Sequence, residues 1–211
     1  MLLAVLCGVA GLLTGPVLMV CLRRLDQERD PASMRRLCVW AGVATVLALA
    51  VLGTRFPGSP ALPAWCWLVA LGVVLAAIDW QHRRLPHPLT AALGLGGLVL
   101  LTVASAQVGQ FDGVWRGIVA AAVVGLVTIA LHLLRPAGFG GGDAVLLPVL
   151  ALFLGYLGWE HLLRGLLLSF LLTGAVAIAL LSTGQARWGE GAGFPAGPPL
   201  ITGALLVVIF H

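Results

Sequence analysis

The stretch GFGGGDAVLLPVLALFLG, residues 138–155, decides how this chain folds. Four of its first five residues are glycine, and a single acid, Asp143, stands between them and an apolar run at 144–158. As a helix, that run of about 15 residues would extend only about 22 Å at 1.5 Å per residue. Because a hydrocarbon core is ~30 Å thick, we expect Asp143 and its glycines to enter the mouth of the helix.

The rest of the chain is equally apolar. Of its 211 residues, 60% are hydrophobic and 9% are charged, whereas soluble domains carry about 25% charged residues. Backbone polar groups in lipid must be satisfied within the segment, so the apolar runs are predicted to be helices. The sequence therefore predicts an all-α membrane protein, a polytopic bundle of about eight transmembrane helices. The expected spans are 2–22, 37–53, 61–78, 89–108, 114–134, 144–158, 162–181 and 200–210.

No boundary between domains is evident. We expect one integral membrane domain over residues 1–211, with the first span and a short loop in 1–36 and the helical core in 37–211. The cysteines form no Cys-x-x-Cys pair, so neither a metal site nor a disulfide framework is predicted.

The arginines predict the orientation of the bundle. All twelve basic residues are arginines, and most lie between apolar runs, which is typical of topology determinants rather than of a nucleic-acid surface. With the N-terminus outside, the cytoplasmic loops hold Arg23, Arg24, Arg29, Arg35, Arg36, Arg83, Arg84, Arg135 and Arg187, and the other side holds Arg55, Arg116 and Arg164. This bias favours that orientation, and it brings Asp79, after the third span, and Asp143, before the sixth, to the cytoplasmic face.

Asp79 and Asp143 differ from the other acids because each directly borders an apolar run. An acid at the membrane boundary is costly to ionise and is therefore a candidate functional group. Structural alternatives stay open: Asp143 would be stabilised by a helix dipole, and Asp79 would pair with Arg83 four residues on. The remaining acids lie in loops or at span ends, where solvation explains them.

Two carboxyls in one site have a specific chemistry. Like charges close together cannot both ionise easily, so the pair holds one proton. One member then acts as a base toward water while the other donates a proton to a carbonyl oxygen, which is sufficient to hydrolyse a peptide without a metal. Gly140, Gly141 and Gly142 lack side chains, so we expect them to line a cleft that admits a substrate backbone; a flexible turn is the alternative.

These segments resemble the type IV prepilin peptidases, a family of bacterial membrane aspartic proteases. The Gly-x-Gly-Asp motif of that family is similar to Gly140–Asp143 here, followed by the leucine-rich span. The family's other aspartate segment resembles AAIDWQHRRLPHPLT at 76–90, which contains Asp79. The closing Pro-Phe-Gly-Pro element resembles residues 194–198, and the first span of the family resembles residues 11–25.

The resemblance implies an aspartic endopeptidase that removes the basic leader of prepilins or pseudopilins at the cytoplasmic face of the bacterial cytoplasmic membrane. It implies Asp79 and Asp143 as the catalytic pair, no cofactor, and a substrate helix and the lipid bilayer as partners. Arg83, Arg84 and His87 are candidate modulators of the pair, although the arginines are also explained by topology. A metal site at Asp79, His82 and His87 is not expected, because the intervening proline gives poor ligand geometry.

Three departures from the family pattern bear on activity. The loop RRLDQERDPASMRR lacks the cytoplasmic domain with two cysteine pairs, which weakens the expectation of the family's second activity, N-methylation of the new pilin N-terminus. Val145 stands where the family often has Lys, and His87 stands where it has Asp or Asn; alternatively, His87 caps the following helix. Two other functions therefore stay open: a non-catalytic pilus or secretion assembly component, and a small transporter that uses the two acids.

Overall fold

The protein is represented by a computed structural model that describes residues 31–83, 85–134, 140–184 and 195–211. These residues form helices and no strand, which confirms the all-α prediction for this part of the chain. The seven helices are α2 (Pro31–Arg55), α3 (Leu62–His82), α4 (His87–Val108), α5 (Asp112–Leu134), α6 (Gly141–Leu157), α7 (Trp159–Ser182) and α8 (Gly197–Ile209). The expected span 2–22 lies outside the described residues, so the count of eight and the orientation of the N-terminus stay predictions.

Among the described residues, five helices are long and apolar enough to cross a membrane, and they make this a multi-pass membrane protein. They are Arg35–Arg55 within α2, all of α3, α4 and α5, and all of α7. The helices α6 and α8 are apolar but shorter. As expected, α6 begins before Asp143, at Gly141, and so includes the acid in its first turn.

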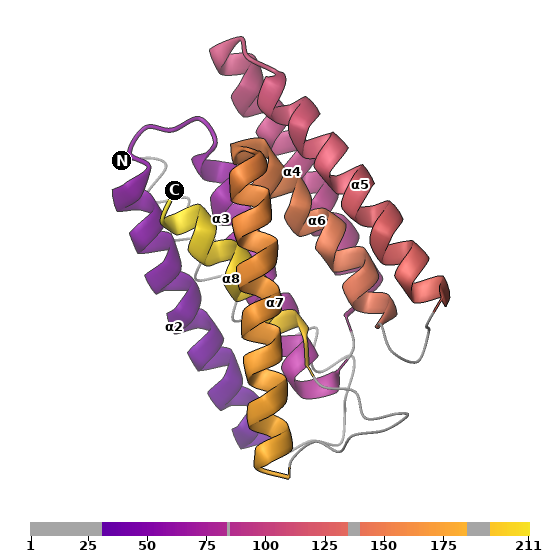
Figure 1. The fold of residues 1–211 in the computed structure, drawn as a ribbon. Coiled ribbons are helices and arrows are strands. Elements are labelled where there is room, and N and C mark those ends of the chain that lie inside the picture. The colour runs from indigo at the N-terminus through magenta and orange to yellow at the C-terminus, as the bar shows by residue number, and fades with distance from the viewer. Residues whose placement is uncertain (1–30, 84, 135–139, 185–194) are drawn as a thin grey trace.

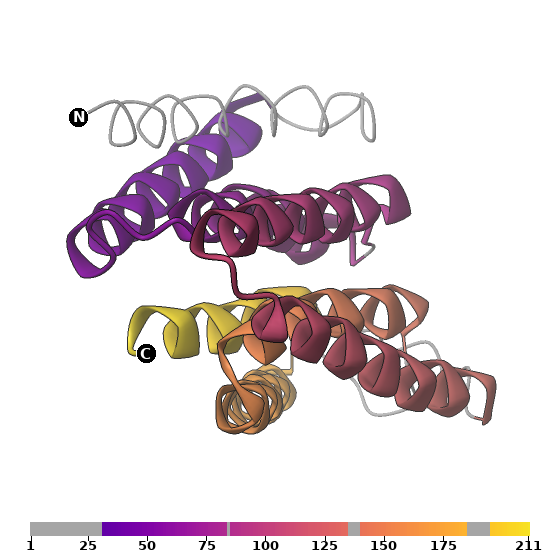
Figure 2. The same cartoon turned by 90° about the horizontal axis from the view of Figure 1, so that it is seen from above.

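The helices pack in two groups (Figures 1 and 2). Figure 2 shows α2, α3 and α4 on one side of the molecule, and α5, α6 and α8 on the other, with α7 outermost. Contacts between α3 and α8 and between α4 and α6 join the two groups. The helices α3 and α6, which carry Asp79 and Asp143, contain the most buried residues.

The core between the groups is aromatic and closely packed. The ring of Trp65 on α3 lies 6.2 Å from that of Phe153 and 6.0 Å from that of Tyr156, both on α6. A Cβ added at Gly97 on α4 would collide with the Phe153 ring, so glycine is required there. These contacts fix α6 against α3 and α4.

Small residues bring α5 and α6 close together. A Cβ added at Gly155 would lie 2.6 Å from the Cβ of Ala120 and 3.1 Å from the Cα of Gly117. Such small residues let helix backbones approach in membrane proteins, where van der Waals packing drives association. The side chain of Arg116 then donates to the carbonyl oxygens of Gly155 at 3.0 Å and of Tyr156 at 2.8 Å, satisfying acceptors at the end of α6.

A proline inside α6 is compensated by α5. Pro148 has no N–H, so it cannot donate to the carbonyl oxygen of Ala144 four residues earlier. The hydroxyl of Thr128, only 4% exposed, donates to that oxygen at 3.0 Å. Helix breaks are tolerated in lipid when a neighbouring side chain satisfies the freed group in this way. The bond anchors the first turn of α6, and with it the backbone beside Asp143.

Large apolar side chains cover the outer faces of the long helices. Leu126 on α5 is 73% exposed and Leu163 on α7 is 68% exposed. In water a surface of this kind would drive association, whereas hydrocarbon accommodates it. The exposed apolar faces of these helices are therefore consistent with contact with lipid.

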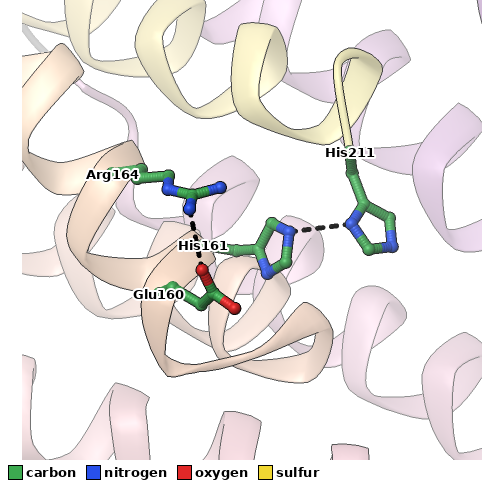
Figure 3. Close-up of polar contacts among 4 residues, drawn as sticks. All are labelled: Glu160, His161, Arg164 and His211. Carbon is green, nitrogen blue, oxygen red and sulfur yellow. Dashed lines mark hydrogen bonds and ion pairs between the residues drawn. The ribbon is translucent and has the colours of Figure 1, made fainter.

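At the end of the bundle opposite Asp79, α7 and the C-terminal residue meet (Figure 3). The Nε2 atom of His161 and the Nδ1 atom of His211 lie 2.8 Å apart, so one ring donates a hydrogen bond to the other. The rings of His211 and Phe56 stack with centroids 6.4 Å apart, and Arg164 pairs with Glu160 at 2.8 Å. These contacts tie α8 to α7 and to the end of α2.

Candidate active site

Asp79 is held near the end of α3 rather than beyond it. We expected the span to end at residue 78, but α3 continues to His82, so the predicted boundary was too early. The backbone N–H of Arg83 donates to the carbonyl oxygen of Asp79 at 2.8 Å, which closes the last turn. Hydropathy detects where apolar side chains stop, whereas the helix ends where its backbone bonds stop. Asp79 is therefore a helical residue, only 5% exposed.

The carboxylate of Asp79 has one hydrogen-bond partner that sequence reasoning missed. The backbone N–H of Gly197, the first residue of α8, donates to Oδ2 of Asp79 at 2.8 Å. A Cβ added at Gly197 would lie 2.9 Å from Oδ2 and 3.1 Å from Cγ. Gly197 belongs to the closing element noted in the sequence, to which we assigned no role in the site. The available signal was a glycine directly before two prolines, which is typical of a helix start.

Asp143 lies at the same end of the bundle. It occupies the first turn of α6 and is partly buried. The loop after Asp79 contributes to this arrangement, because a Cβ added at Gly142 would lie 2.9 Å from the Cβ of Leu85. Leu85 thus packs directly against the backbone that precedes Asp143. The fold places the two acids that the sequence singled out at the same end of the bundle.

The glycines before Asp143 pack against atoms of this chain. A Cβ at Gly140, the exposed N-cap of α6, would lie 3.0 Å from Oδ2 of Asp143. One at Gly141 would lie 3.4 Å from the ring of His132 on α5, which is ordinary contact. The closest contact is at Gly142, where the side chain of Leu85 occupies the space that a Cβ would need. A role of Gly140, Gly141 and Gly142 in a substrate cleft stays a prediction.

The candidate modulators are placed differently. Arg83 is exposed and adopts a left-handed conformation with φ 51°, and it forms no ion pair with Asp79, so the expected structural pairing is absent between these two described residues. Arg84 lies outside the described residues. His87 is exposed and is the first residue of α4, whose N-cap is Pro86, so the expectation that His87 caps this helix is wrong. Val145 is 37% exposed, which leaves the position at which the family often has Lys open to its surroundings.

The arrangement places a buried carboxyl group, that of Asp79, and a partly buried one, that of Asp143, at the same end of the bundle. Packing of Leu85 against the backbone at Gly142 supports this arrangement. One structural interpretation of Asp143 also fits: as an acid in the first turn of α6 it interacts favourably with the helix dipole. That role does not account for a buried Asp79 at the same end of the bundle.

Comparison with known proteins assigns the chain to a family. The sequence model of the type IV leader peptidase family matches residues 66–178, more than half of the chain, including both acids and the glycines before Asp143. No curated protein and no solved structure gives a significant match. The family resemblance noted in the sequence is thereby confirmed: the chain belongs to the type IV leader peptidase family.

Proposed function

We propose that this protein is a membrane aspartic endopeptidase that removes the basic leader of type IV prepilin-like or pseudopilin-like precursors, with Asp79 and Asp143 as its catalytic pair. One observation carries the proposal: a buried Asp79 and a partly buried Asp143 lie at the same end of the bundle, where Leu85, which follows Asp79 in the chain, packs against the backbone before Asp143. The family match, which spans both acids, supports the same chemistry.

Hydrolysis by such a pair begins with one carboxylate and one carboxylic acid. The carboxylate takes a proton from water while the water oxygen bonds to the scissile carbonyl carbon, and the acid gives its proton to the carbonyl oxygen. The resulting diol collapses: the first acid, now protonated, gives its proton to the leaving nitrogen, and the second takes one from a diol hydroxyl. The C–N bond breaks, and both acids return to their starting states.

The membrane setting supports this choice of substrate class. The helices that carry the acids are apolar, so the precursor is expected to bind as an apolar helix with a basic leader extending into the cytoplasm. The distribution of arginines supports a cytoplasmic position for the acids, in the cytoplasmic membrane of a bacterium.

The test is cleavage of a defined probe. The protein is co-expressed with a tagged precursor built from a short Lys/Arg-rich leader, a glycine and an apolar pilin-type helix, and loss of the leader is followed by gel mobility and mass. We expect wild-type cleavage and loss of at least about a thousandfold in Asp79→Asn and Asp143→Asn, since the residues of a catalytic unit act together. Persistent cleavage by either variant would falsify the pair.

Asp112→Asn is the matched control. Asp112 is exposed at the start of α5, at the opposite end of the bundle, so the same change of charge is expected to leave cleavage intact. If no pilin-type precursor is cut and the two active-site variants instead change proton or cation flux in vesicles, the transporter function replaces this proposal. If pilus assembly requires the protein but tolerates both variants, a non-catalytic assembly role replaces it.

A further inference from the structure

The two acids of the pair have different surroundings. Oδ2 of Asp79 accepts a hydrogen bond from the backbone N–H of Gly197, across 118 positions of sequence. Among the described residues, Asp143 has no comparable backbone donor: the N–H of Ala144, the next residue, donates to the carbonyl oxygen of Gly140 at 3.1 Å. Within the part of the chain that the structure describes, the two acids therefore differ in their backbone donors before any substrate binds.

The start of α8 is built so that one amide faces Asp79. Pro198 and Pro199 follow Gly197 and have no N–H, and the N–H of Leu200 already donates to the carbonyl oxygen of Ala196 at 3.1 Å. Gly197 thus supplies the one backbone N–H among the first three residues of α8. A helix N-terminus carries partial positive charge, which favours an anion beside it.

The absent side chain of Gly197 is as important as its amide. With a Cβ 2.9 Å from Oδ2 and 3.1 Å from Cγ, any other residue would push the carboxylate away from its donor. The angle φ does not explain the glycine, because Gly197 is not among the residues with positive φ. Close approach of the carboxylate is the reason that the structure offers for glycine at this position.

The rest of α8 holds that amide in place. The hydroxyl of Ser169 on α7 donates to the carbonyl oxygen of Leu200 at 2.8 Å. A Cβ added at Gly203 would lie 2.5 Å from the backbone nitrogen of Ser169, so α7 and α8 pack backbone to backbone. These contacts hold the start of α8, and with it the amide of Gly197, against α7.

We propose that Gly197 is a positioning residue that holds Asp79 as the ionised member of the pair, so that Asp79 takes the proton from water and Asp143 donates to the carbonyl oxygen. A hydrogen bond from an amide favours the charged form of a carboxylate, and the charge so maintained on Asp79 favours the protonated form of Asp143. This assignment of roles rests on the proposed peptidase function.

The test compares two glycine-to-alanine variants of the same helix. Leader removal from the basic-leader probe is measured against pH with purified protein in nanodiscs, per mole of folded enzyme. For Gly197→Ala we expect kcat to fall at least about tenfold and the acid limb of the profile to move up by about one pH unit, since a hydrogen bond to a charged group is lost. For Gly203→Ala, which disturbs α8 against α7, we expect less folded protein with the acid limb unmoved.

The pH profile separates positioning from packing. The other titratable groups at this end of the described residues are Arg35, Arg36 and Cys38 on α2, His82 at the end of α3, Arg83 directly after it, His87 on α4, His132 on α5 and Asp143 on α6, and all are unchanged in both variants. The proposal is overturned if the acid limb of the pH profile stays in place in Gly197→Ala. It is also overturned if the acid limb moves equally far in Gly203→Ala. If Gly197→Ala cannot be recovered in folded form, Pro198→Gly is used instead, because it loosens the same turn without adding atoms. For Pro198→Gly we expect the acid limb of the pH profile to move up by less than in Gly197→Ala. An acid limb that does not move overturns the proposal.

The peptidase function and the positioning role of Gly197 are tested by separate results. If the wild-type protein cuts the probe and the Asn variants of both acids do not, the peptidase function stands whatever Gly197→Ala does. If the wild-type protein does not cut, the peptidase function is wrong and the role of Gly197 in it is wrong as well.

Discussion

Thr128 donates a hydrogen bond to the carbonyl oxygen of Ala144 at 3.0 Å, and this is the oxygen that Pro148 leaves without its helical donor. The bond joins α5 to the first turn of α6, one residue after Asp143. A proline that would weaken an isolated helix is therefore accommodated by a side chain of the neighbouring helix.

We expect Thr128→Val to lower the free energy of unfolding by about 1–3 kcal/mol, because it leaves a buried carbonyl oxygen without a donor. Thr128→Ser keeps the hydroxyl and should cost less. The measurement is unfolding of the purified protein in mixed detergent micelles. In a Pro148→Ala background, residue 148 regains an N–H for Ala144, so the cost of Thr128→Val should drop below about 1 kcal/mol. Equal costs in the two backgrounds would show that the hydroxyl has another role.

Gly142→Ala is expected to reduce cleavage of a pilin-type probe by about tenfold or more, because the new Cβ would lie 2.9 Å from the Cβ of Leu85 and would displace the turn that carries Asp143. Gly141→Ala adds a Cβ in ordinary contact with His132 and should have a smaller effect. Gly174→Ala, which meets nothing within 4 Å, is the control for the substitution itself. Equal loss in the Gly141 and Gly142 variants would instead favour clearance for substrate at both positions.

The dependence of cleavage on pH should be bell-shaped. The rate requires one acid of the Asp79–Asp143 pair to be ionised and the other to be protonated, so it falls when both are protonated and again when both are ionised. Measuring kcat/KM across the range in which the protein stays folded checks this, with Asp112→Asn expected to give the same curve. A profile with a single limb would mean that only one acid titrates in the reaction.

His161→Ala and His211→Ala are each expected to lower stability by about 0.5–1.5 kcal/mol, the usual net value of one hydrogen bond, and to leave cleavage unchanged. The bond of 2.8 Å between the two rings lies at the end of the bundle opposite the acids (Figure 3). Because both variants remove the same bond, the double variant should cost less than the sum of the single ones. Additive costs would mean that the rings act independently.

Much of the architecture could be predicted from local sequence. A helix in lipid satisfies its own backbone groups, so an apolar run of sufficient length is enough to predict one, and α3, α4, α5 and α7 lie close to their expected positions. The two acids could be singled out in the same way, since each borders an apolar run. The end of α3 could not be predicted in this way. Asp79 remains in the helix because its carbonyl oxygen accepts a hydrogen bond from the N–H of Arg83, and hydropathy does not detect backbone hydrogen bonds.

The contacts that define the site could not be predicted in this way. Gly197 and Asp79 are far apart in sequence, and neither residue type indicates the other; the same holds for Gly142 with Leu85 and for Thr128 with Ala144. Each contact depends on how helices from distant parts of the chain pack against one another, within a few tenths of an ångström.

Hydrophobicity and the satisfaction of backbone hydrogen bonds act within each segment, so the amino-acid sequence is enough to identify a bundle of membrane helices with two candidate acids. The contact of the Gly197 amide with Asp79, and the packing of Leu85 against the backbone before Asp143, become visible in the folded chain alone. These relationships arise from the close packing of helix surfaces, which no single segment encodes.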